Sequence, residues 1–366
     1  MSSLIESPSA TPHRTPTGEM FGYQLDAPGS LSFRSLPVPS TPEDGVLMRT
    51  IATSICSTDI SFYEGNLFPQ QYPVTLGHEY LGRVVEVGRR LSGISVGERI
   101  VYWGQSDFGG LAQYQTLRPV FARQSLRDHF FAERDFMDDA RAAAVVVPDE
   151  IGDDHASLIE PVTGALRSIL RNPPEVGDRV LVLGAGPIGI IAGAIFAALY
   201  ATSGVDATDA VPARTAQASH FFADNAYLPD ELAAVPESTY DYVFDCLPPL
   251  NVADPAACPR RNAMLALKPG GKYVLYGASQ TRQLLDTWLM LSKGLRIVSA
   301  SFDVRSYPMH MTALVIDKAM ELIRRGIVPA AEMVTQRVPF TDAAAVEGVF
   351  ANYRGTPHLK TVIHHE

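Results

Sequence analysis

The sequence predicts two domains of different class, a mostly β domain and an α/β domain with a doubly wound parallel sheet. Three observations support this prediction. Residues 20 to 110 contain short β-branched runs separated by Gly and Pro. Strand-like and helix-like segments alternate between residues 179 and 299. The chain of 366 residues is long enough for two domains of ordinary size.

Composition narrows the possible partners. The chain is 46% hydrophobic and 19% charged, as expected of a globular protein. Its net charge of -10 argues against broad contact with nucleic acid or with an anionic membrane, because both require clustered Lys and Arg. The longest apolar run, residues 188 to 200, is too short to span a bilayer. We therefore expect a small-molecule partner.

The cysteines and the N-terminus indicate a cytoplasmic protein. Only Cys56, Cys246 and Cys258 are present, and an odd number of distant cysteines disfavours a disulfide framework. Residues 1–19 are rich in Ser, Thr and Pro and lack the apolar segment of a secretory signal. We expect them to form a disordered leader.

The run from Gly77 to Gly82, read together with Cys56, predicts a metal site. A cysteine thiolate, the imidazole of His78 and the carboxylate of Glu79 are donors that catalytic zinc accepts. A single His-Glu pair is more often a surface hydrogen bond, so the prediction depends on the combination. Strands are expected at 46–51, 81–87 and 97–102, which would place these residues at the edge of a sheet.

A helical pattern between residues 149 and 172 contains Pro161, which predicts a break or kink at Glu160. A glutamate at a kink can point into a cavity, so Glu160 is a second candidate carboxylate for the metal. A solvent-exposed glutamate at a helix end is the alternative.

A strand at 179–183 leads into Gly184-Ala185-Gly186-Pro187-Ile188-Gly189 and an apolar helix. This order predicts a dinucleotide site. The first glycine permits a tight turn, the second lets a pyrophosphate approach the backbone, and the third permits close packing. Asp209, twenty residues after Gly189, is expected to accept the ribose hydroxyls and to favour NAD over NADP. Arg214 could instead pair with a 2′-phosphate, and Asp209 could be an ordinary loop residue.

Further strands are expected at 240–245, 271–276, 295–299 and 360–363, and a helix at 312–325. Gly277 and Ala278 follow one of these strands, so their backbone is expected to contact the nicotinamide side of the cofactor. The last segment is expected to complete the first domain. His364 and His365 could trap a metal, although a solvated chain end is the expectation.

The motifs together resemble the zinc-dependent branch of the medium-chain dehydrogenase/reductase superfamily, and more narrowly the sorbitol and related polyol dehydrogenases. The resemblance covers residues 20–366 and depends on five motifs: Cys56-x-Thr58-Asp59, Gly77-His78-Glu79-x-x-Gly82, Gly88, Glu160-Pro161 and the glycines at 184–189. It implies a GroES-like catalytic domain at 20–168 and 306–366, a Rossmann domain at 169–305, and zinc in the cleft between them.

The resemblance also implies roles for the site residues. Cys56 and His78 would bind one catalytic zinc, with Glu79 and Glu160 acting directly or through water. Thr58 resembles the hydroxyl that relays the alcohol proton. Asp59 resembles an acid close to the metal ligands, and Ser61 stands where classical alcohol dehydrogenases have a histidine. No cysteine lies between residues 57 and 245, so the structural zinc of related enzymes is expected to be absent.

The expected function is reversible oxidation of a secondary alcohol, such as a polyol, sugar or cyclitol, to its ketone with NAD. Phe62, Tyr63 and Trp103 are candidate pocket-wall residues, and a core role is equally open. One alternative is a zinc-free NADPH-dependent reductase of alkenes or quinones. Another is a non-catalytic binding protein that retains the fold. The resemblance implies a homodimer or homotetramer, with 299–302 as a candidate contact.

Overall fold

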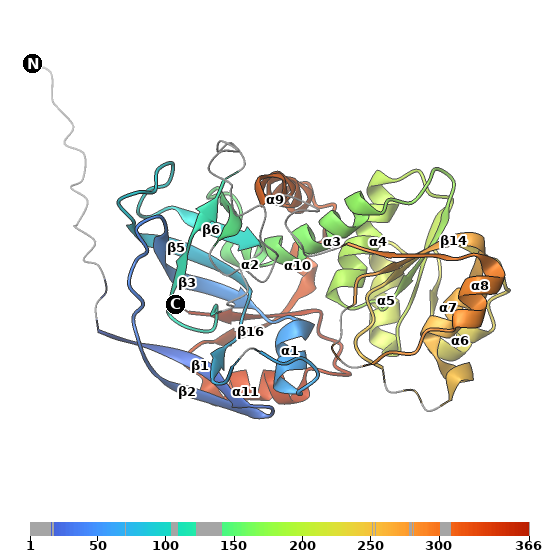
Figure 1. The fold of residues 1–366 in the computed structure, drawn as a ribbon, viewed down its shortest axis with the longest axis horizontal. Helices are drawn as coiled ribbons and strands as arrows, with labels where there is room; N and C mark the ends of the chain where they lie inside the picture. The colour runs from blue at the N-terminus through green and yellow to red at the C-terminus, as the bar shows by residue number, and fades with distance from the viewer. Residues whose placement is uncertain are drawn as a thin grey trace, which may run out of the picture.

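The structure is a computed structural model that describes residues 16, 18–69, 71–103, 109–121, 141–250, 252, 254–277, 280, 282–300 and 309–365. Most of the predicted leader lies outside these residues, and the first strand already includes Glu19. Figure 1 shows two lobes side by side, one formed by both ends of the described chain and the other by its middle. We call them the β lobe and the Rossmann-like lobe.

The β lobe contains strands β1 (Glu19–Ala27), β2 (Ser30–Pro37), β3 (Val46–Ser54), β4 (Val74–Thr75), β5 (Glu79–Val87), β6 (Arg99–Trp103), β7 (Tyr114–Leu117), β8 (Pro119–Val120), β9 (Ala142–Val146), β16 (Val334–Pro339) and β17 (Lys360–His364). The larger sheet has the order β16-β17-β3-β5-β6-β9-β8, and β7 also pairs with β3. The smaller sheet has the order β2-β1-β4. Pairing of β17 with β3 shows that the last segment completes the first sheet, as expected.

Six helices accompany these strands: α1 (Ser57–Tyr63), α2 (Asp153–Ser157), α3 (Ile159–Arg171), α9 (Met309–Arg324), α10 (Ala330–Met333) and α11 (Ala343–Asn352). The predicted break at Glu160 is wrong by two residues, because α2 ends before Leu158 and α3 begins at Ile159. Pro161 therefore lies in the first turn of α3, where a helix tolerates proline because its missing N–H is not needed.

The Rossmann-like lobe contains strands β10 (Arg179–Leu183), β11 (Gly204–Thr208), β12 (Ala226–Tyr227), β13 (Tyr240–Asp245), β14 (Leu267–Leu275) and β15 (Arg296–Ser299). All neighbouring pairs are parallel, in the order β12-β11-β10-β13-β14-β15. This is the strand order of a dinucleotide-binding sheet, and it confirms the predicted doubly wound class.

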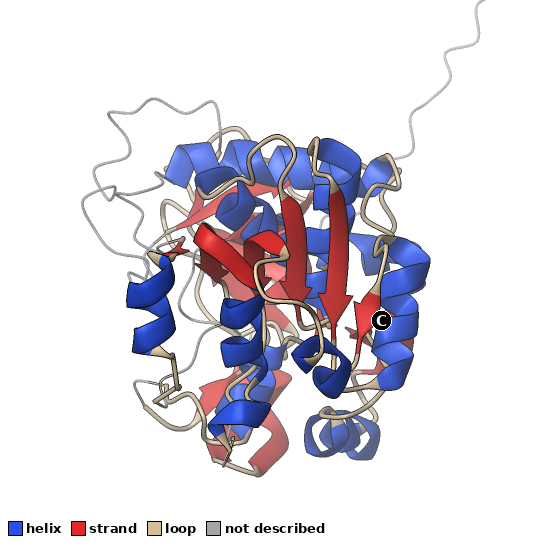
Figure 2. Ribbon diagram, turned by 90° about the vertical axis from the view of Figure 1, so that its right-hand side faces the viewer, coloured by secondary structure: helices blue, strands red, loops and turns tan. Residues whose placement is uncertain are grey.

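Helices cover both faces of this parallel sheet, as Figure 2 shows. They are α4 (Pro187–Leu199), α5 (Pro212–Phe221), α6 (Pro229–Ala233), α7 (Pro259–Ala266) and α8 (Thr287–Lys293), with a short 3-10 turn at Pro255–Ala257. The side chains of α4 and α5 share one apolar cluster with one face of the sheet. Those of α6, α7 and α8 share another with the opposite face. No described helix is long and apolar enough to cross a membrane.

Strand β11 is buried although it carries an aspartate. The carboxylate of Asp206 accepts hydrogen bonds from the Arg179 guanidinium at 2.8 Å, from the Tyr240 hydroxyl at 2.8 Å and from the backbone and side-chain nitrogens of Asn225. A buried charge is tolerated when it is paired and fully hydrogen-bonded. These contacts explain how so polar a segment forms a central strand.

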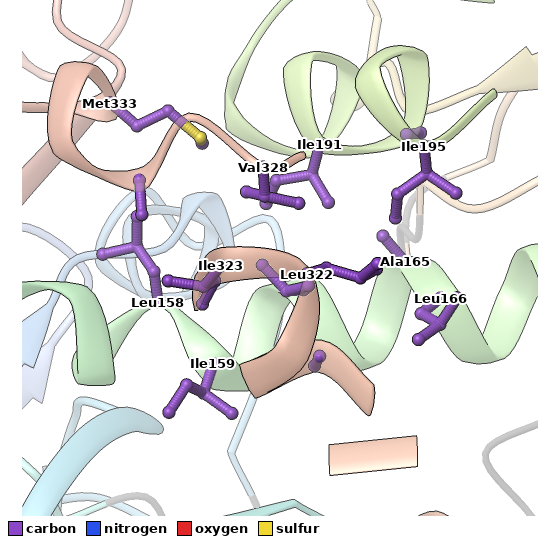
Figure 3. Close-up of a cluster of buried hydrophobic side chains, with 14 of the residues drawn as sticks. Leu158, Ile159, Ala165, Leu166, Ile191, Ile195, Leu322, Ile323, Val328 and Met333 are labelled. Atoms are coloured by element: carbon purple, nitrogen blue, oxygen red, sulfur yellow. The ribbon is translucent and has the colours of Figure 1, made fainter. Parts of the chain in front are cut away.

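The largest apolar cluster extends through both lobes. Figure 3 shows Ala165 and Leu166 of α3 close to Ile191 and Ile195 of α4, while Leu322 and other side chains of the C-terminal segment cover the same region. In Figure 1, α3 runs between the two sheets. The two lobes therefore share a continuous, close-packed interior.

The expectation of a solvated chain end is wrong. The imidazole of His365 stacks on Phe340, with ring centroids 4.1 Å apart, and burial lowers the pKa of His365 to about 3. His364 Nε2 lies 2.7 Å from a carboxylate oxygen of Asp154. Both histidines belong to the packing around β17, because this strand is paired on both sides.

Candidate active site

Three of the predicted ligands converge where β3 ends and β5 begins. Cys56 is the N-cap of α1, His78 directly precedes β5, and Glu79 opens β5 opposite Ser54 of β3. One ligand atom from each of Cys56, His78 and Glu79 lies within 4.8 Å of the other two. Sulfur, nitrogen and oxygen donors at this spacing can bind one divalent ion, with a further position open.

Asp59 orients two of these ligands. Its carboxylate accepts hydrogen bonds from the backbone N–H groups of Cys56 at 3.0 Å and Gly77 at 2.9 Å, and it lies 3.4 Å from Nδ1 of His78. Burial acts to raise the pKa of Asp59, but the charge of His78 and these hydrogen bonds hold it below its usual value. A carboxylate behind a metal-binding histidine fixes the ring so that its other nitrogen faces the ion.

The Glu79 carboxylate is fully buried, and only one of its two oxygens has hydrogen-bond partners. One oxygen accepts hydrogen bonds from the Ser54 hydroxyl and from the Lys360 ammonium, which is itself buried. The other oxygen, Oε1, is buried and has no hydrogen-bond partner. An orphaned carboxylate oxygen is expensive unless a cation takes the missing place. This oxygen and the donor set fit a zinc ion.

Glu160 borders this cluster without joining it. It lies in the first turn of α3 and is not among the three residues whose ligand atoms converge. Burial, and then the nearby charge of Glu79, raise the pKa of Glu160 to about 7, although His78 acts in the opposite direction. The position suits a carboxylate that reaches the ion through water.

Thr58 lies beside the cluster, with its hydroxyl oxygen 3.6 Å from the sulfur of Cys56. Ser61, one turn further along α1, is buried, and its hydroxyl accepts a hydrogen bond from Arg354 at 3.3 Å. Arg354 also forms an ion pair with Glu64. Ser61, which stands where classical alcohol dehydrogenases have a histidine, is therefore held by the guanidinium of Arg354.

The glycine segment between β10 and α4 has an open central position. Gly184 has φ +92°, which only glycine adopts readily. A Cβ on Gly189 would lie 1.8 Å from the carbonyl oxygen of Gly184, so this position excludes any side chain. A Cβ on Gly186 would meet only Arg214, at 3.9 Å. Pro187 begins α4 and Ile188 follows it, so the N–H groups of the first turn face this open space.

Asp209 directly follows β11 and is almost fully buried. Its two carboxylate oxygens accept hydrogen bonds from the backbone N–H groups of Ala185 and Val211, each at 2.9 Å. The acid thus holds the glycine segment against the start of α5. Arg214 points back over Gly186, and its buried Nε has no hydrogen-bond partner. Both side chains border the predicted dinucleotide site.

The other predicted contacts differ in outcome. A Cβ on Gly277 would lie 2.2 Å from the Leu247 carbonyl oxygen, so this glycine allows two loops to pack backbone to backbone. Ala278 lies outside the described residues. Phe62 and Tyr63 pack against the apolar cluster around α11, and Trp103 is buried under the guanidinium of Arg167, 3.8 Å from its ring centroid. All three residues take part in packing, and their role as pocket walls stays a prediction.

Sequence reasoning missed Lys360, Ser54 and Tyr276. Lys360 had a detectable signal, because a lysine that opens a buried β-branched strand needs an anionic partner. Ser54 had none, since serines commonly end strands. Tyr276 follows β14, and its ring reaches α3 in the other lobe, which no local pattern reveals.

Comparison with known proteins gives the same assignment for the fold. Residues 42–122 match the family described as "Alcohol dehydrogenase GroES-like domain". L-threonine 3-dehydrogenase of Shewanella woodyi is 34% identical over 167 residues, covering 43% of this chain and 48% of the relative. The chain thus spans about half the length of the curated relatives it matches.

Solved structures match nearly the whole chain. A Sinorhizobium meliloti protein described as a zinc-binding dehydrogenase, bound to NADP, has a TM-score of 0.73 at 22% identity and covers 95% of this chain and 99% of its own. The 2R,3R-butanediol dehydrogenase of Bacillus subtilis has a TM-score of 0.71 at 19% identity, covering 95% and 100%. The family match therefore assigns residues 42–122 to an alcohol dehydrogenase GroES-like domain, and the structural neighbours show that the chain has the two-lobed fold of these dehydrogenases.

Proposed function

We propose that this protein interconverts a secondary alcohol and its ketone, using one zinc ion and NAD. The observation that carries the proposal is the convergence of Cys56, His78 and Glu79 next to an orphaned buried oxygen, in a chain that also has a dinucleotide-type sheet. The nearby negative groups outnumber the one buried ammonium, that of Lys360, so the site favours a cation.

Each residue has a defined task in this proposal. Cys56, His78 and Glu79 would hold the zinc, which acts as a Lewis acid on the substrate oxygen. Asp59 keeps the imidazole of His78 in position. Thr58 Oγ1, 3.6 Å from the Cys56 sulfur, can accept the substrate hydroxyl proton and pass its own outward. The glycine segment and Asp209 would hold NAD, which supplies the hydride acceptor.

Metal content and turnover together test the proposal. Elemental analysis should give about one zinc per chain, because only one described cluster has the required donors. Absorbance of reduced nicotinamide should rise when NAD and a suitable alcohol are added. Chelation should abolish this activity, and added zinc should restore it. Metal-free protein that reduces alkenes or quinones with NADPH would contradict the proposal and favour the zinc-free alternative.

We propose a substrate with a second polar group next to the reacting carbinol. Two similar proteins are named for threonine and for butanediol, and both compounds have a second polar group next to a carbinol. Polyols, sugars and cyclitols share it, so they remain the first class to screen. The site residues would then act on one hydroxyl while the neighbouring group sets orientation.

The preference for NAD should depend on the charge of Asp209. We expect Asp209→Asn to lower the ratio of kcat/KM for NAD to that for NADP by about tenfold, because it removes repulsion of a 2′-phosphate. The amide keeps only one of the two acceptor oxygens, so the loss of one backbone hydrogen bond, from Ala185 or Val211, should affect both cofactors alike and cancel in the ratio. Arg214→Gln is the matched variant. Arg214 points toward Gly186 and should therefore contact the pyrophosphate. We expect Arg214→Gln to weaken the binding of both cofactors equally. A changed ratio in the Arg214 variant, with none in the Asp209 variant, would reverse the two assignments.

We propose that two copies associate through the edge of the Rossmann-like sheet. Strand β15 ends this sheet among the described strands, and the adjacent segment exposes 61% of Leu284, 71% of Trp288 and 77% of Leu291. Exposed apolar patches of this kind mark protein interfaces. The three cysteines are free, as expected in a reducing compartment, so we propose that the protein is cytoplasmic.

Light scattering on a sizing column tests this association. The wild type should have at least twice the mass of one chain, and Trp288→Glu with Leu291→Glu should be monomeric. Val96→Glu is the control, because Val96 is 46% exposed and lies between β5 and β6 in the β lobe. A monomeric wild type would disprove the interface.

A further inference from the structure

Gly164 is an unusual residue for its position. It lies inside α3, where glycine is less favourable than alanine because its backbone loses more freedom on folding. A Cβ built on Gly164 would lie 2.7 Å from the hydroxyl oxygen of Tyr276, closer than such atoms can approach. The hydroxyl of a residue from the other lobe thus occupies the space of the missing side chain.

Tyr276 is held firmly at its backbone, and its side chain reaches α3 of the β lobe. Its N–H and that of Gly277 both donate to the carbonyl oxygen of Asp245, at 2.9 Å each, which extends the pairing of β13 with β14. Its ring packs on Phe244 with centroids 5.6 Å apart. The hydroxyl lies at the other end of the side chain, against Gly164 of the β lobe.

The hydroxyl lies between the two halves of the proposed site. Glu160 is four residues before Gly164, so the two share one face of α3. Burial, followed by the charges of Glu160, Cys56 and Glu79, raises the pKa of Tyr276 well above its usual value, so the hydroxyl stays a proton donor. The backbone of Tyr276 lies at the carboxyl edge of the parallel sheet, where dinucleotides bind.

A nicotinamide ring has to bridge these two places, because its reactive carbon must reach a substrate at the metal while its phosphates remain at the glycine segment. We propose that the Tyr276 hydroxyl donates a hydrogen bond to the carboxamide oxygen of the nicotinamide, and that residue 164 is glycine to leave room for this hydroxyl. The inference depends on the proposed cofactor and adds the residue that positions its reactive end.

Binding of two ligands to the zinc-loaded protein tests the inference without turnover. NADH carries the nicotinamide, whereas ADP-ribose lacks it and keeps the adenosine and both phosphates. Tyr276→Phe should weaken NADH binding about three- to tenfold, the usual net effect of one hydrogen bond, and leave ADP-ribose binding within twofold. Calorimetric titration measures both dissociation constants.

Gly164→Ala provides an independent second variant. Its methyl group should displace the hydroxyl and weaken NADH binding to a similar extent, while the unfolding temperature stays the same or rises because alanine favours the helix. In a Tyr276→Phe background the alanine should have no further effect on NADH, because the atom it displaces is gone. Tyr200→Phe is the control, since Tyr200 packs on Phe196 at the far end of α4.

The possible outcomes separate the two proposals. Equal losses for NADH and ADP-ribose in Tyr276→Phe, or no loss in either, would overturn the role of Tyr276. Additive effects in the double variant would overturn the role of Gly164. A wild type that binds neither ligand would instead overturn the proposed cofactor, and with it the proposed function.

Discussion

Replacement of Cys56 by serine is expected to remove the bound zinc and to lower kcat/KM about a thousandfold. The Cys56 sulfur is one of three converging donors, and two remaining ligands hold zinc poorly. Loss of a Lewis acid worth several kcal/mol of transition-state stabilisation gives a rate loss of about this size. Elemental analysis and steady-state kinetics on the purified variant measure the two effects.

Cys258→Ser is the matched control for this experiment. Cys258 is the N-cap of α7 in the Rossmann-like lobe and lies outside the ligand cluster, so its loss should leave zinc content unchanged. The circular dichroism spectrum of Cys56→Ser should match that of the wild type, because Cys56 is only half-buried. Full zinc content in Cys56→Ser would show that the ion binds elsewhere.

Replacement of Lys360 by methionine is expected to destabilise the metal-free protein by about 3–5 kcal/mol. The Lys360 and Glu79 side chains are each only 1% exposed, and removal of the lysine leaves a buried carboxylate without its counter-charge. Urea unfolding in the presence of a chelator measures the loss. Zinc should recover part of it, because the ion supplies positive charge to the same carboxylate.

Two further variants test this explanation. Adding Glu79→Gln to Lys360→Met should restore much of the stability, since no unpaired charge remains. Lys268→Met is the surface control. The ammonium of Lys268 pairs with Asp241 at 2.8 Å but the side chain is 44% exposed, so we expect the free energy of unfolding to fall by at most about 1 kcal/mol. Equal losses in the Lys360 and Lys268 variants would mean that Glu79 is not held as a buried anion.

Local patterns were sufficient for most of the fold. The strands at 179–183 and 240–245 were predicted at their observed bounds, because parallel strands buried on both faces appear as short continuous apolar runs. The position of the helix break was wrong because a proline cannot distinguish an interior kink from a first turn. The chain end was also misjudged, because packing of His365 on Phe340 depends on tertiary contacts.

The candidate site was only partly predictable. Cys56, His78 and Glu79 were found because their donor chemistry is specific and two of them are adjacent in sequence. The pairing of Lys360 with Glu79 joins residues 281 positions apart, and the contact of Tyr276 with Gly164 joins the two lobes. Contacts of this range are set by topology, and one sequence alone does not reveal them.

The shared interior around α3 limits how the two lobes can move relative to each other. Side chains of α3 pack against α4 on one side and against α9 on the other. Moving the lobes straight apart would therefore expose this close-packed apolar surface to water. A hinge rotation with its axis near α3 avoids this loss. Glu160 and Gly164, near the axis, would hardly move during entry of the dinucleotide, whereas elements far from α3, such as β2 in one lobe and α6 in the other, would move most.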